Sequence, residues 1–341
     1  MGRTQRLLTG LEAWWDARRR RRRVQRPMQN FRIESYGGHG GRHGVVVRGR
    51  VLDNPVPTSA VEGEGLFTAL RRSVAQFRTI ELPGVPLRLV VADTCVQVVT
   101  DGDGYFRAEL PGLPLEHPWH QGSVELRGTY RDVTDPHRTP VAIRVPAESA
   151  TYGVISDVDD TILQTGVQRV WVMVRRTLFG SALTRAPFPG AAELYRDLAG
   201  EENPVFYVSS SPWNLHGFLL AFLRHHGFPS GPVLLRDLVG DRTGRARKHE
   251  RIEEVLALHP HLRFVLIGDS GELDPQIYAD IVRAHPGRIR AVYIREVRLD
   301  PGDRRVEQVS DTWSHDVPFV LAADTDAVRQ HARSIGLLPA R

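Results

Sequence analysis

The 341-residue chain has a single cysteine, Cys95, and therefore cannot form an intrachain disulfide. It has no uninterrupted apolar run near the roughly 18 residues that a membrane-spanning helix needs. Its first residues lack the apolar stretch of a signal peptide, and Arg6 stands where a myristoylation signal needs Ser or Thr. These absences argue against a disulfide-stapled secreted domain and against a spanning membrane protein, and they favour a cytoplasmic protein.

Lysine is almost absent as well, because Lys248 is the only lysine among the 45 Lys and Arg residues. The general excess of arginine is typical of a GC-rich genome. A lone lysine in such a chain indicates a position where a compact ammonium is needed and a broad planar guanidinium does not fit. The alternative is that one lysine has remained by chance.

The positive charge is not spread along the chain, although the net charge is +5. Residues 1–26 carry nine arginines against Glu12 and Asp16, a net charge of +7, so the rest of the chain carries −2. The folded part of the protein is therefore close to neutral, and the excess charge belongs to a short leader.

We interpret residues 1–30 as a basic amphipathic leader. Several apolar and aromatic residues fall on one helical face, namely Leu7, Leu8, Leu11, Trp14 and Trp15. Six consecutive arginines follow at 18–23, a combination that suits an anionic membrane surface. A solvated tail is the alternative. Nucleic acid is the less favoured partner, because no aromatic interleaving and no fold signature accompanies the arginines.

Residues 31–150 have the pattern of short β-strands joined by turns. The segments with the strongest strand pattern are Val45–Val51, Leu87–Val91, Val96–Val99, Phe106–Leu110, Ser123–Leu126 and Val141–Val145. Residues 66–77 have helical spacing and predict one inserted helix. Short strands with turns between them are typical of a small β-sandwich.

One turn of this domain carries two aspartates. The sequence VTDGDGYFRAEL resembles the hairpin of transthyretin-like and carboxypeptidase-regulatory sandwich domains. Asp101 and Asp103 would suit calcium, but the other ligands of a calcium loop are missing, so we predict a plain hairpin turn.

Residues 151–341 change to apolar strands that alternate with helices. Strands are predicted at 152–156, 204–208, 233–235, 264–267, 289–294 and 319–322. Helices are predicted at 191–199, 215–223, 248–258 and 275–284, with a last helix near the C-terminus. This alternation predicts a doubly wound parallel α/β sheet, whose ligand site lies past the carboxyl ends of the strands.

Four polar clusters stand at strand ends or open a helix, where that rule expects chemistry. They are residues 157–161, residues 209–211, Lys248 and residues 268–274.

The first cluster is DVDDT, with three carboxylates in four residues that repel one another unless a cation neutralises them. Oxygen ligands of this kind favour Mg²⁺.

The four clusters together resemble the motifs of the haloacid dehalogenase-like phosphatase superfamily. The matching residues are Asp157-x-Asp159-x-Thr161, the strand-end Ser209, Lys248, and Gly268-Asp269 with Asp274. The longer segments around these motifs are ISDVDDTIL, FYVSSSPWNL and FVLIGDSGELDPQIY. They are similar to one branch of this superfamily, the actin-patch-associated Mg²⁺-dependent phosphatidate phosphatases. That resemblance covers about residues 150–300, and the preceding β-domain fits it less specifically.

The resemblance implies four catalytic residues. Asp157 is the expected nucleophile, which forms an aspartyl-phosphate, and Asp159 is the expected general acid and base. Ser209 is expected to hydrogen-bond the transferring phosphoryl group, and Lys248 to neutralise charge on Asp157 and the phosphate.

The resemblance also implies a Mg²⁺ site. Asp157 and Asp269 are expected to hold the ion with their side chains, and Asp159 with its backbone carbonyl. Asp274 is expected to support the ion through water or through Lys248.

Some of these residues have a structural alternative. Ser211 and Asp274 each precede a proline and are suited to cap a helix. We assign the phosphate contact to Ser209, because it directly follows the predicted strand. Trp213 either lines the entrance of the site or packs in the core.

The insertion between the first two motifs, residues 164–185, is short and includes the apolar and basic stretch Val167–Arg176. A large cap domain would close over a small soluble metabolite, whereas a small flap leaves the site open to a bulky or membrane-borne phosphomonoester. The alternative is that this insertion packs as an ordinary helix.

The sequence therefore predicts a β-sandwich followed by a haloacid dehalogenase-like domain that hydrolyses phosphatidate to diacylglycerol and phosphate with Mg²⁺. We expect the protein in the cytoplasm, peripheral on the inner face of the membrane. Two alternatives stay open: a phosphatase of another exposed phosphomonoester, such as a phosphoprotein or sugar phosphate, and a non-catalytic membrane-associated binding protein. No protein partner is indicated.

Overall fold

The structure is a computed structural model, which describes residues 28, 30–54, 80–158, 188–236, 244–270, 273–296, 309, 313 and 315–339. Four predicted features lie outside these ranges: the leader, the helix at 66–77, Asp159 with Thr161, and the insertion at 164–185. None of the helices in the described ranges combines the length and apolar character that crossing a membrane requires.

The first structural unit, here called the N-terminal β-unit, is built from eight strands. They are β1 Phe31–Gly41, β2 Gly44–Asp53, β3 Ile80–Glu81, β4 Pro86–Val91, β5 Thr94–Val99, β6 Tyr105–Leu110, β7 Trp119–Leu126 and β8 Thr139–Arg144. All of them belong to one sheet of order β3-β2-β1-β8-β7-β4-β5, with β6 paired to β2. The sheet encloses its own apolar core, in which Val47, Leu89 and Val124 are fully buried.

The second structural unit, here called the α/β-unit, alternates strands and helices. Its strands are β9 Tyr152–Asp157, β10 Val205–Pro212, β11 Val233–Arg236, β12 Arg263–Asp269, β13 Ile289–Arg295 and β14 Phe319–Ala322. Its helices are α4 Ala191–Ala199, the 3-10 turn η3 Trp213–Leu215, α5 His216–His225, α6 Gly244–Leu258, α7 Asp274–Ala284 and α9 Thr325–Ser334.

The six strands of the α/β-unit form one sheet of order β11-β10-β9-β12-β13-β14, and every pairing in it is parallel. Two apolar cores cover its two faces. One contains side chains of α4, α5 and α9, and the other contains side chains of α6 and α7. The prediction of a mixed α/β protein is confirmed.

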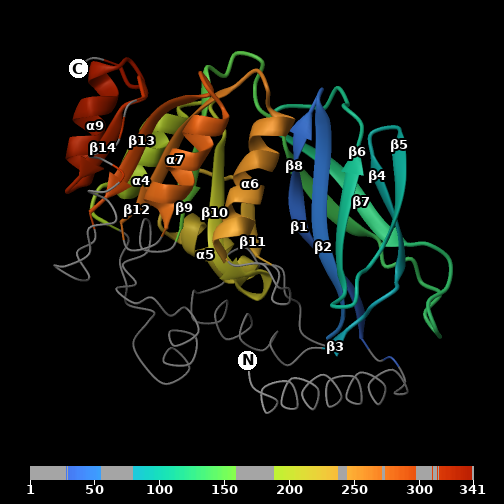
Figure 1. Ribbon diagram of the computed structural model, residues 1–341. Coiled ribbons are helices and arrows are strands. Elements are labelled where there is room, and N and C mark those ends of the chain that lie inside the picture. Colours follow the sequence, from blue (N-terminus) through green and yellow to red (C-terminus); the bar gives the residue numbers. More distant parts are fainter. Residues whose placement is uncertain are drawn as a thin grey trace, which may run out of the picture.

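The two units lie side by side, with α6 next to the strands of the N-terminal β-unit (Figure 1). The contact between them is a seam of buried side chains, in which Tyr105 of β6 belongs to the same apolar core as α4 and α5. This seam borders α5 and α6 of the α/β-unit, so its contacts bear on the site described below.

Most predicted elements are confirmed within a few residues, and the differences have physical causes. Strand β1 was not predicted, because its sequence FRIESYGGHGG has four glycines and several polar residues among few apolar ones. It nevertheless pairs with β2 over almost its whole length, since Gly38 and Gly40 let the two backbones approach closely.

Ser211 does not cap a helix. Strand β10 continues through Pro212, which occupies the N-cap position of η3 without a side-chain hydrogen bond. The turn at Asp101 is confirmed, because its side chain accepts hydrogen bonds from the backbone N–H groups of Asp103 and Tyr105, both at 2.9 Å. The prediction of a hairpin is wrong, because β5 pairs with β4 and β6 pairs with β2, so the turn joins two strands that are not paired with each other.

Candidate active site

Three predicted site residues meet at one edge of the parallel sheet. Strand β9 lies between β10 and β12, and Asp157 and Asp269 are the last residues of β9 and β12. In the pairing of β9 with β10, Asp157 lies opposite Val208, so Ser209 comes one residue beyond it. Because all three strands are parallel, their carboxyl ends deliver these side chains to the same place.

Lys248 reaches this edge from the second turn of α6. Its Nζ donates to Asp157 Oδ1 at 2.7 Å and also to Asp274 Oδ1. Lys248 is 3% exposed, and both carboxylates are fully buried. A buried ammonium and a buried carboxylate are tolerated only as partners, so each of these charges depends on the others.

Three carboxylates converge beside this ammonium. Asp157, Asp269 and Asp274 each place one carboxylate oxygen within 4.8 Å of the others, and all three residues are fully buried. Among the described residues, this cluster joins three carboxylates and the one ammonium of Lys248, an excess of carboxylate over ammonium. A donor set made of oxygen atoms with such an excess fits a hard divalent cation such as Mg²⁺.

Asp274 is fixed more closely than the sequence suggests. It is the first residue of α7, and Leu273 holds the N-cap position, so Asp274 does not act as the cap. Its Oδ2 accepts the backbone N–H of Asp269 at 3.4 Å. A Cβ atom at Gly268 would clash with the Asp274 carboxylate and would lie 2.8 Å from Tyr278 Cε2. Glycine at 268 is therefore required for Asp274 to lie against the end of β12.

Two tyrosines that sequence reasoning missed make hydrogen bonds near the ends of β9 and β12, the strands that carry Asp157 and Asp269. The Tyr195 hydroxyl lies 2.6 Å from Ser156 Oγ, which donates to the backbone carbonyl of Asp157 at 2.7 Å. The Tyr278 hydroxyl donates to the carbonyl of Ile267 at 2.9 Å. Burial raises the pKa of both tyrosines, so they stay neutral donors. Their spacing on amphipathic helices gives no signal that separates them from ordinary core residues.

Ser209 lies at the site with its hydroxyl pointing into the turn that follows. It is 3% exposed, and its Oγ accepts the backbone N–H of Ser211 at 2.9 Å. Trp213, for which entrance and core were both considered, is 2% exposed and belongs to the core. The structure thus brings together Asp157, Ser209, Lys248, Asp269 and Asp274, while Asp159 lies outside the described residues.

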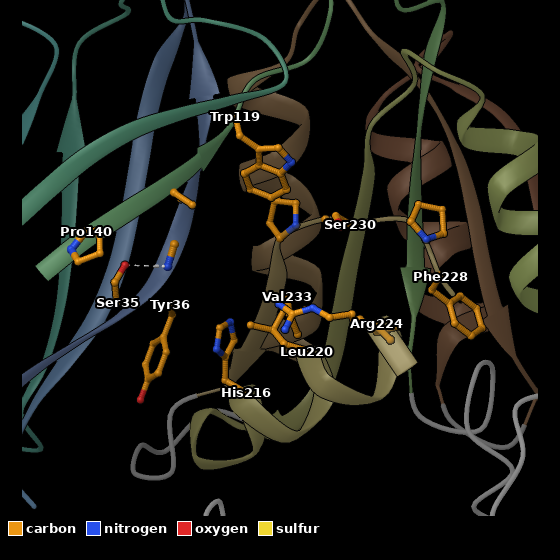
Figure 2. Close-up of a pocket in the computed structure, with 17 residues that line it drawn as sticks. Ser35, Tyr36, Trp119, Pro140, His216, Leu220, Arg224, Phe228, Ser230 and Val233 are labelled. Carbon is orange, nitrogen blue, oxygen red and sulfur yellow. Dashed lines mark hydrogen bonds between the residues drawn. The ribbon is translucent and has the colours of Figure 1, made fainter. Parts of the chain in front are cut away.

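A cavity of about 350 Å³ lies in the seam between the units, not at the carboxylates. In Figure 2 Tyr36 comes from β1, Trp119 from β7, and His216 and Arg224 from α5. Burial lowers the pKa of His216 to about 3, so this imidazole is neutral near pH 7. None of the five site residues lines this cavity.

Comparison with known proteins bears on the α/β-unit. Residues 152–296 match the family model described as phosphatidate phosphatase APP1, catalytic domain. The chain is 31% identical over 169 residues to phosphatidate phosphatase APP1 of Saccharomyces cerevisiae, covering 47% of this chain and 29% of that protein. It is also 31% identical over 153 residues to an uncharacterized protein of Schizosaccharomyces pombe, covering 43% of this chain and 25% of that protein.

The chain therefore spans less than a third of the length of these curated relatives. Among solved structures, a haloacid dehalogenase family hydrolase from Deinococcus radiodurans, with bound phosphate and sodium, is similar at 15% identity and a TM-score of 0.35. That match covers 57% of this chain and all of that chain.

Proposed function

Because residues 152–296 form an APP1-like catalytic domain, we propose that the chain is a phosphatidate phosphatase, which releases diacylglycerol and inorganic phosphate. The observation that carries this proposal is the buried contact of Lys248 with Asp157 and Asp274, beside Asp269. A carboxylate that is paired with an ammonium at a strand end is suited to accept a phosphoryl group, since the transferred charge meets a fixed cation.

In the proposed reaction the Asp157 carboxylate attacks phosphorus, and the bond from phosphorus to the diacylglycerol oxygen breaks. Asp159, whose role rests on the family resemblance, gives its proton to that leaving oxygen. Asp159 then takes a proton from water, the water oxygen attacks phosphorus, and the aspartyl-phosphate bond breaks to regenerate Asp157. Ser209 donates a hydrogen bond to a non-bridging phosphoryl oxygen, and Lys248 neutralises charge throughout.

The carboxylate cluster fits Mg²⁺, and Asp157 and Asp269 would hold the ion with Asp274 in support. When bound, Mg²⁺ offsets the negative charge of the carboxylates and of the phosphoryl oxygens. The carboxylates of Asp157, Asp269 and Asp274 supply the negative charge that would attract the ion. The ammonium of Lys248 offsets part of that charge.

The finer fold assignment belongs to the same proposal. We interpret the six-stranded parallel sheet, with helices on both faces, as doubly wound and haloacid dehalogenase-like. We interpret the N-terminal β-unit as a sandwich whose strands remain joined in one sheet. Both assignments rest on strand order and on the placement of the cores.

A phosphate-release screen tests the function. With Mg²⁺, we expect the full chain to release phosphate from phosphatidate in mixed micelles faster than from a sugar phosphate or a phosphopeptide. EDTA should stop the release, and added Mg²⁺ should restore it, because the carboxylate cluster keeps its excess charge without the ion. If the protein released phosphate faster from the phosphopeptide or the sugar phosphate than from phosphatidate, that compound and not the lipid would be assigned as the substrate. No release from any of them, nor from an aryl phosphate, would favour the binding-protein alternative.

The partner of the leader is proposed to be an anionic membrane on the cytoplasmic side. Each arginine near such a surface contributes about 1 kcal/mol, and this attraction fades as salt rises. Deletion of residues 1–26 should therefore weaken co-sedimentation with anionic vesicles at low salt and leave hydrolysis of a soluble aryl phosphate unchanged. Equal binding by both forms of the protein would identify the leader as a solvated tail.

A further inference from the structure

The seam between the two units includes buried contacts close to two of the candidate site residues, Ser209 and Lys248. The first lies at η3, which follows Ser209 by four residues along the chain. Trp213 stacks on Tyr36 of β1, with ring centroids 4.6 Å apart and planes only 6° apart. Figure 2 shows Tyr36 reaching from β1 toward the start of α5. The N-terminal β-unit therefore contacts the 3-10 turn that directly follows the strand of Ser209.

Asn214, the next residue, is held by polar groups of the N-terminal β-unit. Its side chain is 2% exposed, and its Oδ1 accepts from Arg50 Nη1 at 3.3 Å and from the Tyr105 hydroxyl at 3.4 Å. Arg50 is itself fixed by Glu81 at 3.0 Å and by the carbonyl of Asp103 at 3.2 Å. Its guanidinium lies 4.4 Å from the centroid of the Tyr105 ring. Asn214 is thus bound to a rigid group that belongs to the other unit.

The second contact holds α6, the helix that carries Lys248. Glu254 lies six residues further along this helix and accepts from Arg48 Nη1 at 2.7 Å and from Arg107 Nη2 at 2.7 Å. His39 Nε2 lies 3.4 Å from the same carboxylate. Burial alone would raise the pKa of Glu254, but the hydrogen bonds from His39 and Arg48 lower it well below its usual range. The carboxylate therefore stays charged between its partners.

We propose that the N-terminal β-unit positions the catalytic site, with Asn214 holding the Ser209 turn and Glu254 holding the Lys248 helix. This inference rests on the proposed function and adds two positioning residues to it. Neither residue touches the substrate. Buried polar contacts of this kind specify one arrangement more than they add stability. A displacement of about 1 Å at a reacting group costs roughly 100-fold in rate, so these contacts matter for turnover.

The test compares two substitutions at Asn214. Asn214→Leu keeps the size of the side chain and removes the acceptor, whereas Asn214→Asp keeps an acceptor oxygen toward Arg50 and Tyr105. We expect Asn214→Leu to lower kcat roughly 10- to 100-fold on an aryl phosphate, with a smaller change in KM, and Asn214→Asp to stay within about threefold of wild type. Glu254→Gln is expected to lower kcat in the same way.

A matched control separates positioning from a general loss of stability. Val124→Ala makes a cavity in the core of the N-terminal β-unit, away from the seam, and is expected to leave kcat near wild type at a temperature where all variants are folded. Equal losses of kcat in Val124→Ala and Asn214→Leu would overturn the proposal. A wild-type kcat in Asn214→Leu would also overturn the proposal. So would a loss of kcat in Asn214→Asp equal to the loss in Asn214→Leu.

Amide hydrogen exchange gives a readout that does not depend on activity. The backbone N–H of Ser211 bonds to Ser209 Oγ, and its exchange should speed up about tenfold in Asn214→Leu and not in Val124→Ala. If wild type hydrolyses no phosphomonoester, the proposed function fails, and exchange at this turn still decides the positioning role. Unchanged exchange at Ser211 in Asn214→Leu would overturn it.

Discussion

Asp157→Asn should abolish phosphatase turnover and leave the protein folded. An amide cannot form the acyl-phosphate, and loss of a nucleophile typically costs about 10³-fold or more in kcat. The substitution is nearly isosteric in a fully buried site. It also removes one charge from three crowded carboxylates, while Lys248 keeps Asp274 as its partner. Far-UV circular dichroism and the thermal midpoint should therefore stay near wild type while phosphate release disappears.

A matched control for this experiment is Asp326→Asn. Asp326 makes the same kind of contact, an ion pair with Arg329, but its side chain is 88% exposed and far from the sheet edge in the chain. It should retain wild-type activity. Near-normal turnover by Asp157→Asn would show that another group accepts the phosphoryl, and the mechanism proposed here would be wrong.

Lys248→Arg should lose most activity although it preserves the charge. The ammonium lies between Asp157 and Asp274 in a slot where it is 3% exposed, and it donates to both carboxylates from a single atom. A guanidinium spreads its donors over a plane and cannot take that point position without pushing the two carboxylates apart. We expect kcat on an aryl phosphate to fall about 100-fold, as for a misplaced reacting group.

A second variant, Lys248→Met, separates the effect of charge from the effect of side-chain shape, because it removes the charge and leaves a side chain of similar length. Because the positive charge at this position offsets part of the negative charge that attracts the cation, Lys248→Met should bind Mg²⁺ at least as tightly as Lys248→Arg does, and both should be poor catalysts. Activity of Lys248→Arg within about threefold of wild type would show that the single lysine of the chain is a matter of chance, and the phosphatase assignment would survive that result.

The positions of the candidate site residues were predictable, because local sequence patterns determine them. Asp157, Ser209 and Asp269 directly follow apolar runs, and parallel strands deliver such residues to one edge whatever the details of packing. The buried faces of the helices were equally predictable from the sequence. In α5, for example, apolar residues recur at helical spacing and the chain turns at Gly227.

The contacts across the seam were not predictable, because they depend on residues far apart in the chain. His259 is 1% exposed and lies 3.3 Å from His39, 220 residues away. The local sequence around each histidine does not predict that the two side chains are in contact. Strand β1, with its glycines, likewise becomes a strand because β2 and β8 pair with it.

The seam also determines how the chain unfolds. The match to the family model begins at residue 152, yet the partners of Glu254 and the ring that covers Trp213 come from residues before that boundary. A chain cut at 152 would expose an aromatic face and leave a buried carboxylate without its guanidinium partners, at a cost of several kcal/mol. The two units are separate in topology, but in energetic terms they form a single cooperative unit, and heat or denaturant is expected to melt both in one transition.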